Sequence, residues 1–94
     1  MANPFKVPLN AIRAIEIVGR GGTLSSAAAE LGVTPGAVSQ HIGRAEERLG
    51  YVLFERRREG MRPTPALEAA LPHFRQGFRA LADGISAIEE SPRG

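Results

Sequence analysis

Glycines, prolines and hydroxyl residues divide residues 19–50 into two short helical segments, and this division constrains the fold more than any other feature of the chain. Either Thr23 or Ser25 is suited to cap the N-terminus of a short helix with the sequence SSAAAEL. Gly32 follows directly and suits the left-handed residue that ends a helix. A short helix is therefore predicted between these signals.

A second helix is predicted immediately afterwards. Thr34 is a further N-cap, and Pro35 occupies the first helical position, where its missing N–H is not needed. This helix is expected to run to about Leu49, where Gly50 ends it. Two short helices joined by a tight turn that contains glycine form the helix-turn-helix pattern.

The flanking segments complete a small, mainly α-helical fold. Residues 1–8 contain two prolines and are expected to form an irregular arm. A supporting helix is predicted next, from apolar residues at helical spacing, namely Leu9, Ile12, Ile15 and Val18. Residues 51–64 are predicted to form a two-stranded hairpin, or wing, with YVLFE and MRPT as strands and RRREG as the turn. Pro63 confines the second strand to an edge.

A long helix is predicted from Thr64 and Pro65, which repeat the cap-plus-proline pattern, to about Glu90. Pro72 removes the hydrogen bond to the Glu68 carbonyl and is expected to bend the helix in its first third. The helix is about 37 Å long, longer than so small a domain is wide, so part of its apolar stripe is expected to contact a second copy of the chain. The predicted dimer seam follows heptad spacing and consists of Leu67, Leu71, Phe74, Phe78, Leu81, Ile85 and Ile88.

The helix predicted over residues 35–49 has two contrasting faces. The core-facing residues are Val38, Ile42, Ala45 and Leu49. The opposite face carries glycine, which permits close approach to a duplex, and polar residues that can bind base edges: glutamine to adenine, arginine to guanine and serine to either. The residues predicted to read DNA bases are Gly36, Ser39, Gln40 and Arg44. The alternative is an amphipathic helix whose outer face contacts only solvent.

Hydroxyl groups and arginines lie on the elements beside this face. The N-termini of the two short helices carry hydroxyl side chains and free backbone N–H groups, which are suitable ligands for DNA phosphates. The arginines of the wing suit contacts to phosphate or to the minor groove. The residues predicted to make these contacts are Thr23, Ser25, Ser26, Thr34, Arg56, Arg57, Arg58 and Arg62. The alternatives are simple capping for the hydroxyls, which is compatible with phosphate binding, and a solvated charge run for the arginines.

The residues that the chain lacks disfavour several other functions. The 94 residues suit one domain, no cysteine is present, and His41 and His73 lie far apart, so no metal and no cofactor are expected. An enzyme is not expected, because no Cys/His or Ser/His arrangement occurs and the adjacent Glu46 and Glu47 project about 100° apart. No long apolar run and no apolar leader occur, so we expect no membrane partner and a cytoplasmic location.

Three stretches together resemble the N-terminal DNA-binding domain of LysR-type transcriptional regulators: LNAIRAIEIV, TLSSAAAELGVTPGAVSQHIGRAEERLGYVLFER and RPTPA. The resemblance covers about residues 8–66, and the last helix is similar to the family's linker helix. It implies a winged helix-turn-helix over residues 1–64, a dimerising linker helix over residues 65–90 and a tail over residues 91–94. It further implies a dimer that binds an interrupted palindrome, and an effector-binding domain outside these residues, so no small-molecule effector site is expected in this chain.

Two functions of different kinds remain open at this point. The first is sequence-specific binding of double-stranded DNA, with the helix over residues 35–49 in the major groove and the wing on the backbone or the minor groove. The second is a dimerisation module that modulates a full-length regulator by forming heterodimers with it. The seam fits both functions, and salt-dependent DNA binding distinguishes them.

Overall fold

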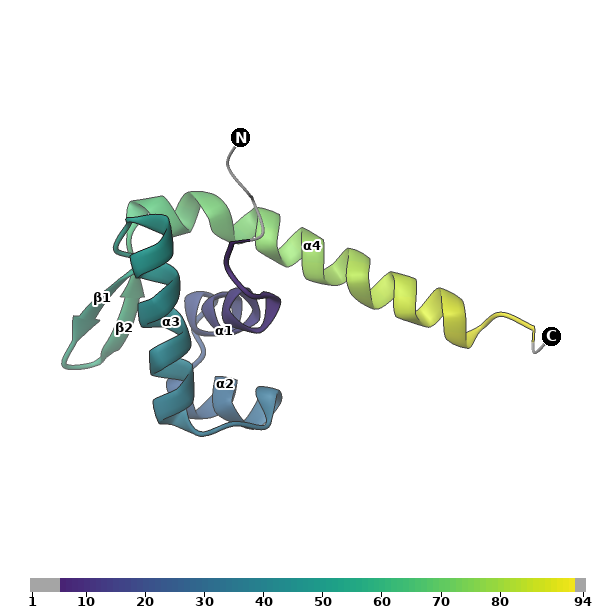
Figure 1. Cartoon of the computed structure of the whole chain (residues 1–94), viewed down its shortest axis with the longest axis horizontal. Coiled ribbons are helices and arrows are strands. Elements are labelled where there is room, and N and C mark those ends of the chain that lie inside the picture. Colours follow the sequence, from purple (N-terminus) through teal and green to yellow (C-terminus); the bar gives the residue numbers. More distant parts are fainter. Residues whose placement is uncertain (1–5, 93–94) are drawn as a thin grey trace.

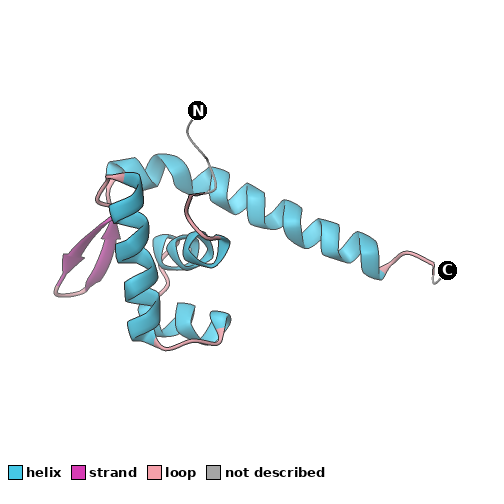
Figure 2. Ribbon diagram, viewed as in Figure 1, coloured by secondary structure: helices cyan, strands magenta, loops and turns pink. Residues whose placement is uncertain are grey.

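The computed structural model of the chain describes residues 6–92, in which four helices carry a two-stranded wing (Figures 1 and 2). The elements are, in order, α1 (Leu9–Gly19), α2 (Leu24–Leu31), α3 (Pro35–Leu49), β1 (Phe54–Arg57), β2 (Gly60–Pro63) and α4 (Pro65–Glu89). The predicted mainly α-helical winged helix-turn-helix followed by a long helix is therefore confirmed. Most of the predicted N-terminal arm, residues 1–5, and the end of the tail, residues 93–94, lie outside the described residues.

A capping box begins α2. The N–H of Ser26 donates to Thr23 Oγ1 at 3.0 Å, and the N–H of Thr23 donates back to Ser26 Oγ at 2.8 Å. Thr23 is therefore the cap, and Ser25 is not. At the other end, Gly32 has a φ of 68°, the left-handed conformation that ends the helix.

The caps of α3 and α4 also follow the sequence signals. The N–H of Ala37 donates to Thr34 Oγ1 at 3.1 Å at the start of α3, and Gly50 ends that helix with a φ of 75°. Thr64 caps α4 in the same way, and its hydroxyl also donates to the Val52 carbonyl at 2.8 Å. This second bond ties the start of α4 to the base of the wing.

The core lies between the first three helices and the first turns of α4. Its largest fully buried side chains are Ile15, Ile17, Ile42, Leu67, Val18 and Val38. The stripe predicted for the first helix is only partly internal, because Leu9 is 58% exposed and Ile12 is half-buried. Ala11 and Ala14 are buried on this side of the helix together with Ile15, Ile17 and Val18.

The wing forms, but the predicted strand limits are wrong. Residues 51–53 precede the first strand, while most of the predicted turn, RRREG, belongs to the strands themselves. The Glu46 carboxylate of α3 explains the late start, because its Oε2 accepts the N–H groups of Leu53 at 2.8 Å and Phe54 at 3.4 Å. Gly60, with a φ of 131°, allows the chain to reverse over Arg58 and Glu59 alone.

Helix α4 runs unbroken through Pro72 and projects beyond the other elements (Figure 1). With this helix included, the molecule measures 52 × 35 × 20 Å. In the figure the helix changes direction within its first third, as expected where a proline removes a backbone hydrogen bond. From Arg79 onward every described residue of α4 is exposed. No helix within residues 6–92 combines the length and apolar character needed to cross a membrane.

Candidate nucleic-acid interface

The outer face of α3 carries the residues predicted to read bases. Gly36, Gln40 and Arg44 are exposed, and Ser39 is half-buried at the margin of the face. The face is held outward because the other side of the helix is locked in the core by Val38, Ile42 and Ala45, each no more than 1% exposed. The structure thus brings the four residues to one side of one rigid helix.

The two glycines of this helix are not required by packing inside the molecule. A Cβ added at Gly36 would have only Thr34 Oγ1 nearby, at 3.9 Å, and one added at Gly43 would meet no atom within 4 Å. Gly43 lies in the interior of α3, where glycine costs about 1 kcal/mol relative to alanine, whereas Gly36 lies in its first turn. Packing within the described residues therefore does not account for either glycine.

The hydroxyls at the helix starts differ in what they can still bind. The Ser26 hydroxyl is fully engaged, because it accepts from the Thr23 N–H and donates to the Thr23 carbonyl at 3.0 Å. Thr23 and Thr34 use their oxygens as capping acceptors, so their O–H groups are able to donate to a phosphate. Ser25 is exposed at the first turn of α2, and its hydroxyl makes no hydrogen bond within residues 6–92.

The wing arginines divide between its two faces. In the antiparallel register Arg56 lies opposite Met61, which packs against the core, so Arg56 shares the inner face. Arg57 and Arg62 share the outer face with Glu55, and Arg57 Nη2 lies 3.1 Å from Glu55 Oε1. Arg58 lies in the turn. All four predicted arginines are exposed, but they form two groups rather than one patch.

The wing tip and the start of α2 lie side by side. Together they line a shallow groove of about 390 Å³, to which Thr23 and Ser25 contribute from one side and Glu59 and Gly60 from the other. In Figure 1 the wing flanks one side of α3, and α2 lies at the lower end of α3. The arrangement therefore groups the α2 N-terminus with the wing, and Glu59 adds a negative charge to this groove.

The predicted dimer seam separates into two parts. Leu67 and Leu71 are 0% and 8% exposed, so they are buried in the chain's own core, because the first turns of α4 pack on α1. The exposed part comprises Leu81, Ile85 and Ile88, at 50%, 60% and 74%. Phe74 and Phe78 are half-buried between these two parts.

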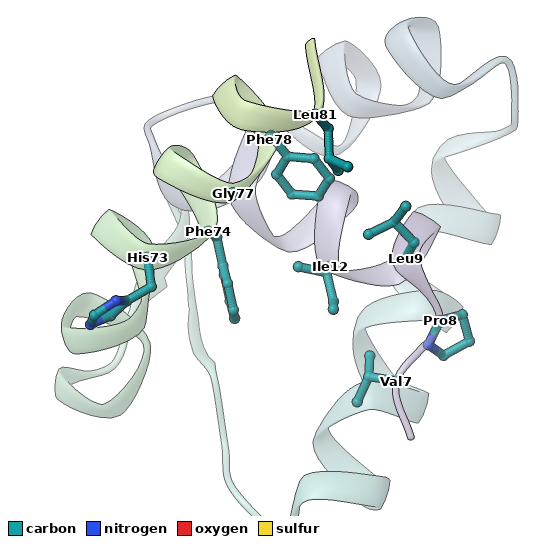
Figure 3. Close-up of a pocket in the computed structure, with 9 residues that line it drawn as sticks. All are labelled: Val7, Pro8, Leu9, Ile12, His73, Phe74, Gly77, Phe78 and Leu81. Atoms are coloured by element: carbon teal, nitrogen blue, oxygen red, sulfur yellow. The ribbon is translucent and has the colours of Figure 1, made fainter. Parts of the chain in front are cut away.

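An apolar groove of about 550 Å³ continues this exposed part toward α1 (Figure 3). Figure 3 shows Phe78 and Leu81 of α4 facing Leu9 and Ile12 of α1 across it. The exposure of Leu9 is thereby explained, since its side chain lines the groove rather than the core. Sequence reasoning missed this role because helical spacing alone does not say which turn of α1 lies beneath α4.

A ring of ion pairs between α1 and α2 was also missed. The buried Glu16 carboxylate lies 2.7 Å from Arg13 and 3.5 Å from Arg20, and Glu30 of α2 lies 3.3 Å and 3.2 Å from the same two arginines. The spacing of Arg13, Glu16 and Arg20 along one helix was the available signal. Among residues 6–92, no group of three His, Cys, Asp or Glu side chains is placed to hold a metal ion.

Comparison with known proteins identifies the family. The profile described as "Bacterial regulatory helix-turn-helix protein, lysR family" matches residues 9–68, close to the predicted span. The transcriptional activator AmpR of Rhodobacter capsulatus is 41% identical over 76 residues, which are 81% of this chain and 26% of that protein. This chain thus spans about a quarter of the length of that curated relative.

Solved structures show the same fold. The oxidized form of Corynebacterium glutamicum OxyR superposes with a TM-score of 0.80 at 24% identity, covering 92% of this chain and 28% of that one. The DNA-binding domain of CbnR, solved as a complex with DNA, has a TM-score of 0.72 at 24% identity and covers 90% of this chain and 98% of its own. The chain therefore belongs to the LysR family of bacterial regulatory helix-turn-helix proteins, as the DNA-binding domain of a transcription regulator and not an enzyme.

Proposed function

We propose that the chain binds double-stranded DNA sequence-specifically, as a homodimer on an interrupted palindrome. Helix α3 enters the major groove, and the wing contacts the backbone or the minor groove. The observation that carries this proposal is the outer face of α3, which is locked outward by the core and bears two glycines that internal packing does not require. The CbnR domain that shares this fold is known in complex with DNA, which supports the same use here.

In this proposal Gln40 contacts the bases, together with Ser39 and Arg44 beside it. Gln40 is exposed on the centre of the outer face, where its amide can pair bidentately with adenine. Arg44 lies one helical turn further along the same face, within reach of a neighbouring guanine. Gly36 and Gly43 let the helix backbone approach the base edges.

The N-terminus of α2 and the wing contact the DNA phosphates. The positive end of the α2 dipole and the exposed Ser25 hydroxyl suit one phosphate, with Thr23 adding an O–H donor. Arg57 must leave Glu55 to bind DNA, but such exposed ion pairs contribute only about 0–1 kcal/mol, so its release is easy. Arg56, Arg58 and Arg62 extend the same electrostatic attraction along the wing.

Two substitutions test whether α3 contacts the bases and the wing contacts the phosphates. The operator is first selected from a random DNA pool, and affinities are then measured on the operator and on a scrambled duplex. We expect Gln40→Ala to lose about 1–3 kcal/mol on the operator only, because it removes a base contact. Arg57→Ala is expected to weaken both duplexes alike and to lower the salt slope by about one, because it removes a phosphate contact.

Glu47→Ala is a control on the same helix: Glu47 is exposed, and because its carboxylate repels DNA phosphates, its removal should weaken binding to neither duplex. Equal weakening of both duplexes by Gln40→Ala, together with an operator-only loss for Arg57→Ala, would show that the assignment is reversed.

The exposed apolar residues at the end of α4 favour a second candidate function. Leu81, Ile85 and Ile88 would let the chain pair with a full-length regulator of the family and modulate it by forming heterodimers. If that is the main function, the chain forms such heterodimers readily but shows no salt-dependent DNA binding of its own. The measurement of affinity against salt concentration therefore distinguishes the two functions.

A further inference from the structure

We infer that Arg13 is a positioning residue that sets the direction of α4 relative to the helix-turn-helix, and so the separation of the two recognition helices in the dimer. The inference rests on the proposed function, because that separation matters only when a dimer binds DNA. It concerns a contact outside the surface that would touch DNA.

Arg13 contacts three helices at once. On its own helix, α1, its Nη1 lies 2.7 Å from Glu16 Oε1, and its Nη2 lies 3.3 Å from Oε2 of Glu30 on α2. Its guanidinium carbon lies 5.1 Å from the centre of the Phe78 ring on α4, within the range of a cation–π interaction. One side chain therefore joins both α1 and α2 to the linker helix.

The ion-pair ring holds this arginine in place. The Glu16 side chain is only 4% exposed, and a buried carboxylate must keep its cationic partners. Arg20 completes the ring by pairing with both Glu16 and Glu30, at 3.5 Å and 3.2 Å. Because Arg13 is tied to two carboxylates, it presents a fixed cationic surface against which the Phe78 ring rests.

Because of Pro72, the direction of α4 beyond this residue depends on its contacts with the rest of the domain. The proline cannot donate to the Glu68 carbonyl, so the helix is more easily bent at this point. Leu67 and Leu71 anchor the part before the proline, whereas residues 79–92 are all exposed. Phe78 is thus the last residue of α4 that is partly buried against its own domain within the described residues.

The geometry of the helix amplifies a small change of direction. From Pro72 to Glu89 the helix is about 25 Å long at 1.5 Å per residue. A tilt of about 10° would therefore move its far end by about 4 Å, which exceeds the axial rise of about 3.4 Å per base pair of the duplex. Since a dimer joins two such helices, losing the Arg13 contact is expected to relax the preferred half-site spacing by about one base pair.

The first experiment measures the direction of α4 without DNA. The chain has no cysteine, so spin labels can be placed at Ala29→Cys on α2 and Ser86→Cys on α4, both exposed positions, with labelled protein diluted in unlabelled protein. We expect Arg13→Gln to widen the distance distribution between the labels at least twofold. Arg20→Gln is the matched control, because it removes an arginine from the same ring that does not contact the Phe78 ring.

Two further variants distinguish loss of the contact between Arg13 and Phe78 from general damage to the fold. Arg13→Lys retains a cation near the ring, so its distribution of label-to-label distances is expected to be nearly as narrow as that of the wild type. Phe78→Leu leaves the ion-pair ring intact but removes the aromatic face, and is expected to widen the distribution as Arg13→Gln does. Equal widths in Arg13→Gln, Phe78→Leu and the wild type would overturn the inference.

The second experiment measures half-site spacing. Affinities are compared for the selected operator and for the same half-sites moved apart or together by one base pair. We expect Arg13→Gln to reduce the preference for the original spacing at least fivefold, while Arg20→Gln keeps it. A uniform loss of affinity at all spacings in Arg13→Gln would show a merely structural role and reject the inference. If the wild type binds no DNA, the proposed function fails, and the spin-label distances still decide whether Arg13 positions α4.

Discussion

Replacing Leu81 with aspartate is expected to convert the proposed dimer to a monomer. Leu81 lies at the start of the exposed apolar part of α4 and lines the groove against α1. It is a better probe than Phe78, because an aspartate at position 78 would lie beside Arg13 and form a new ion pair. Leu81 is 50% exposed in the single chain, so half of its surface is available for a partner to cover.

The size of the effect follows from that exposure. Complete burial of a leucine side chain contributes about 1.5–3 kcal/mol, so covering the exposed half contributes about 0.8–1.5 kcal/mol. Two copies in a symmetric dimer contribute about 1.5–3 kcal/mol, and Leu81→Asp removes this contribution. Burial of two carboxylates costs several kcal/mol more, so the total loss is at least about 5 kcal/mol, or more than about a thousandfold in dissociation constant.

Sedimentation velocity over a range of concentrations measures this change. We expect a wild-type dimer at tens of micromolar and a Leu81→Asp monomer at the same concentration, with unchanged helical circular dichroism. Gln76→Asp is the matched control, since it adds the same charge on the opposite, exposed side of α4 and should leave the dimer intact. A monomeric wild type at these concentrations, or an unaltered dimer in Leu81→Asp, would refute the reasoning.

Three other predictions concern DNA affinity and stability. If each subunit neutralises about three to five phosphates, the log–log slope of affinity against salt is expected near −5 to −9 for a dimer, and a titration by fluorescence anisotropy that gives a slope shallower than about −2 would contradict this footprint. Leu67→Ala is expected to lower the free energy of unfolding by about 2–5 kcal/mol, because Leu67 is 0% exposed, whereas the exposed neighbour Glu68→Ala should change it little; urea denaturation of both variants checks this. Glu46→Gln weakens the acceptor for the Leu53 and Phe54 N–H groups and is expected to lower the free energy of unfolding by about 1–2 kcal/mol, with faster amide exchange at the base of the wing as the second readout.

Local signals predicted the helices and the exposed face of α3. The caps at Thr34 and Thr64, with their following prolines, set helix starts because capping depends on atoms within about three residues. The core-facing positions of α3 followed from the helical period, which also placed Gly36, Gln40 and Arg44 on the outside. The composition of the outer face of α3 is therefore a property of the local sequence, independent of the elements that pack around this helix.

The wing shows where such local reasoning ends. Its first strand begins at Phe54 rather than Tyr51, because Glu46 of α3 accepts the N–H groups of Leu53 and Phe54 at the base of the wing. The division of the arginines between two faces depends on the cross-strand register, in which Arg56 lies opposite Met61. Neither the distant acceptor nor the register is a property of the RRREG segment alone.

Helix α4 shows most clearly which properties the local sequence determines and which only the tertiary structure decides. Its heptad spacing determined which side is apolar, because the helical period fixes the direction of each side chain relative to its neighbours. Only the tertiary structure decided that Leu67 and Leu71 belong to the chain's own core while Ile85 and Ile88 remain exposed. The physical reason is that burial depends on which surface lies opposite a residue, and for α4 that surface is α1, which ends 46 residues before α4 begins (65 − 19 = 46). The contact of Arg13 with the Phe78 ring likewise exists only once folding has brought these two helices together.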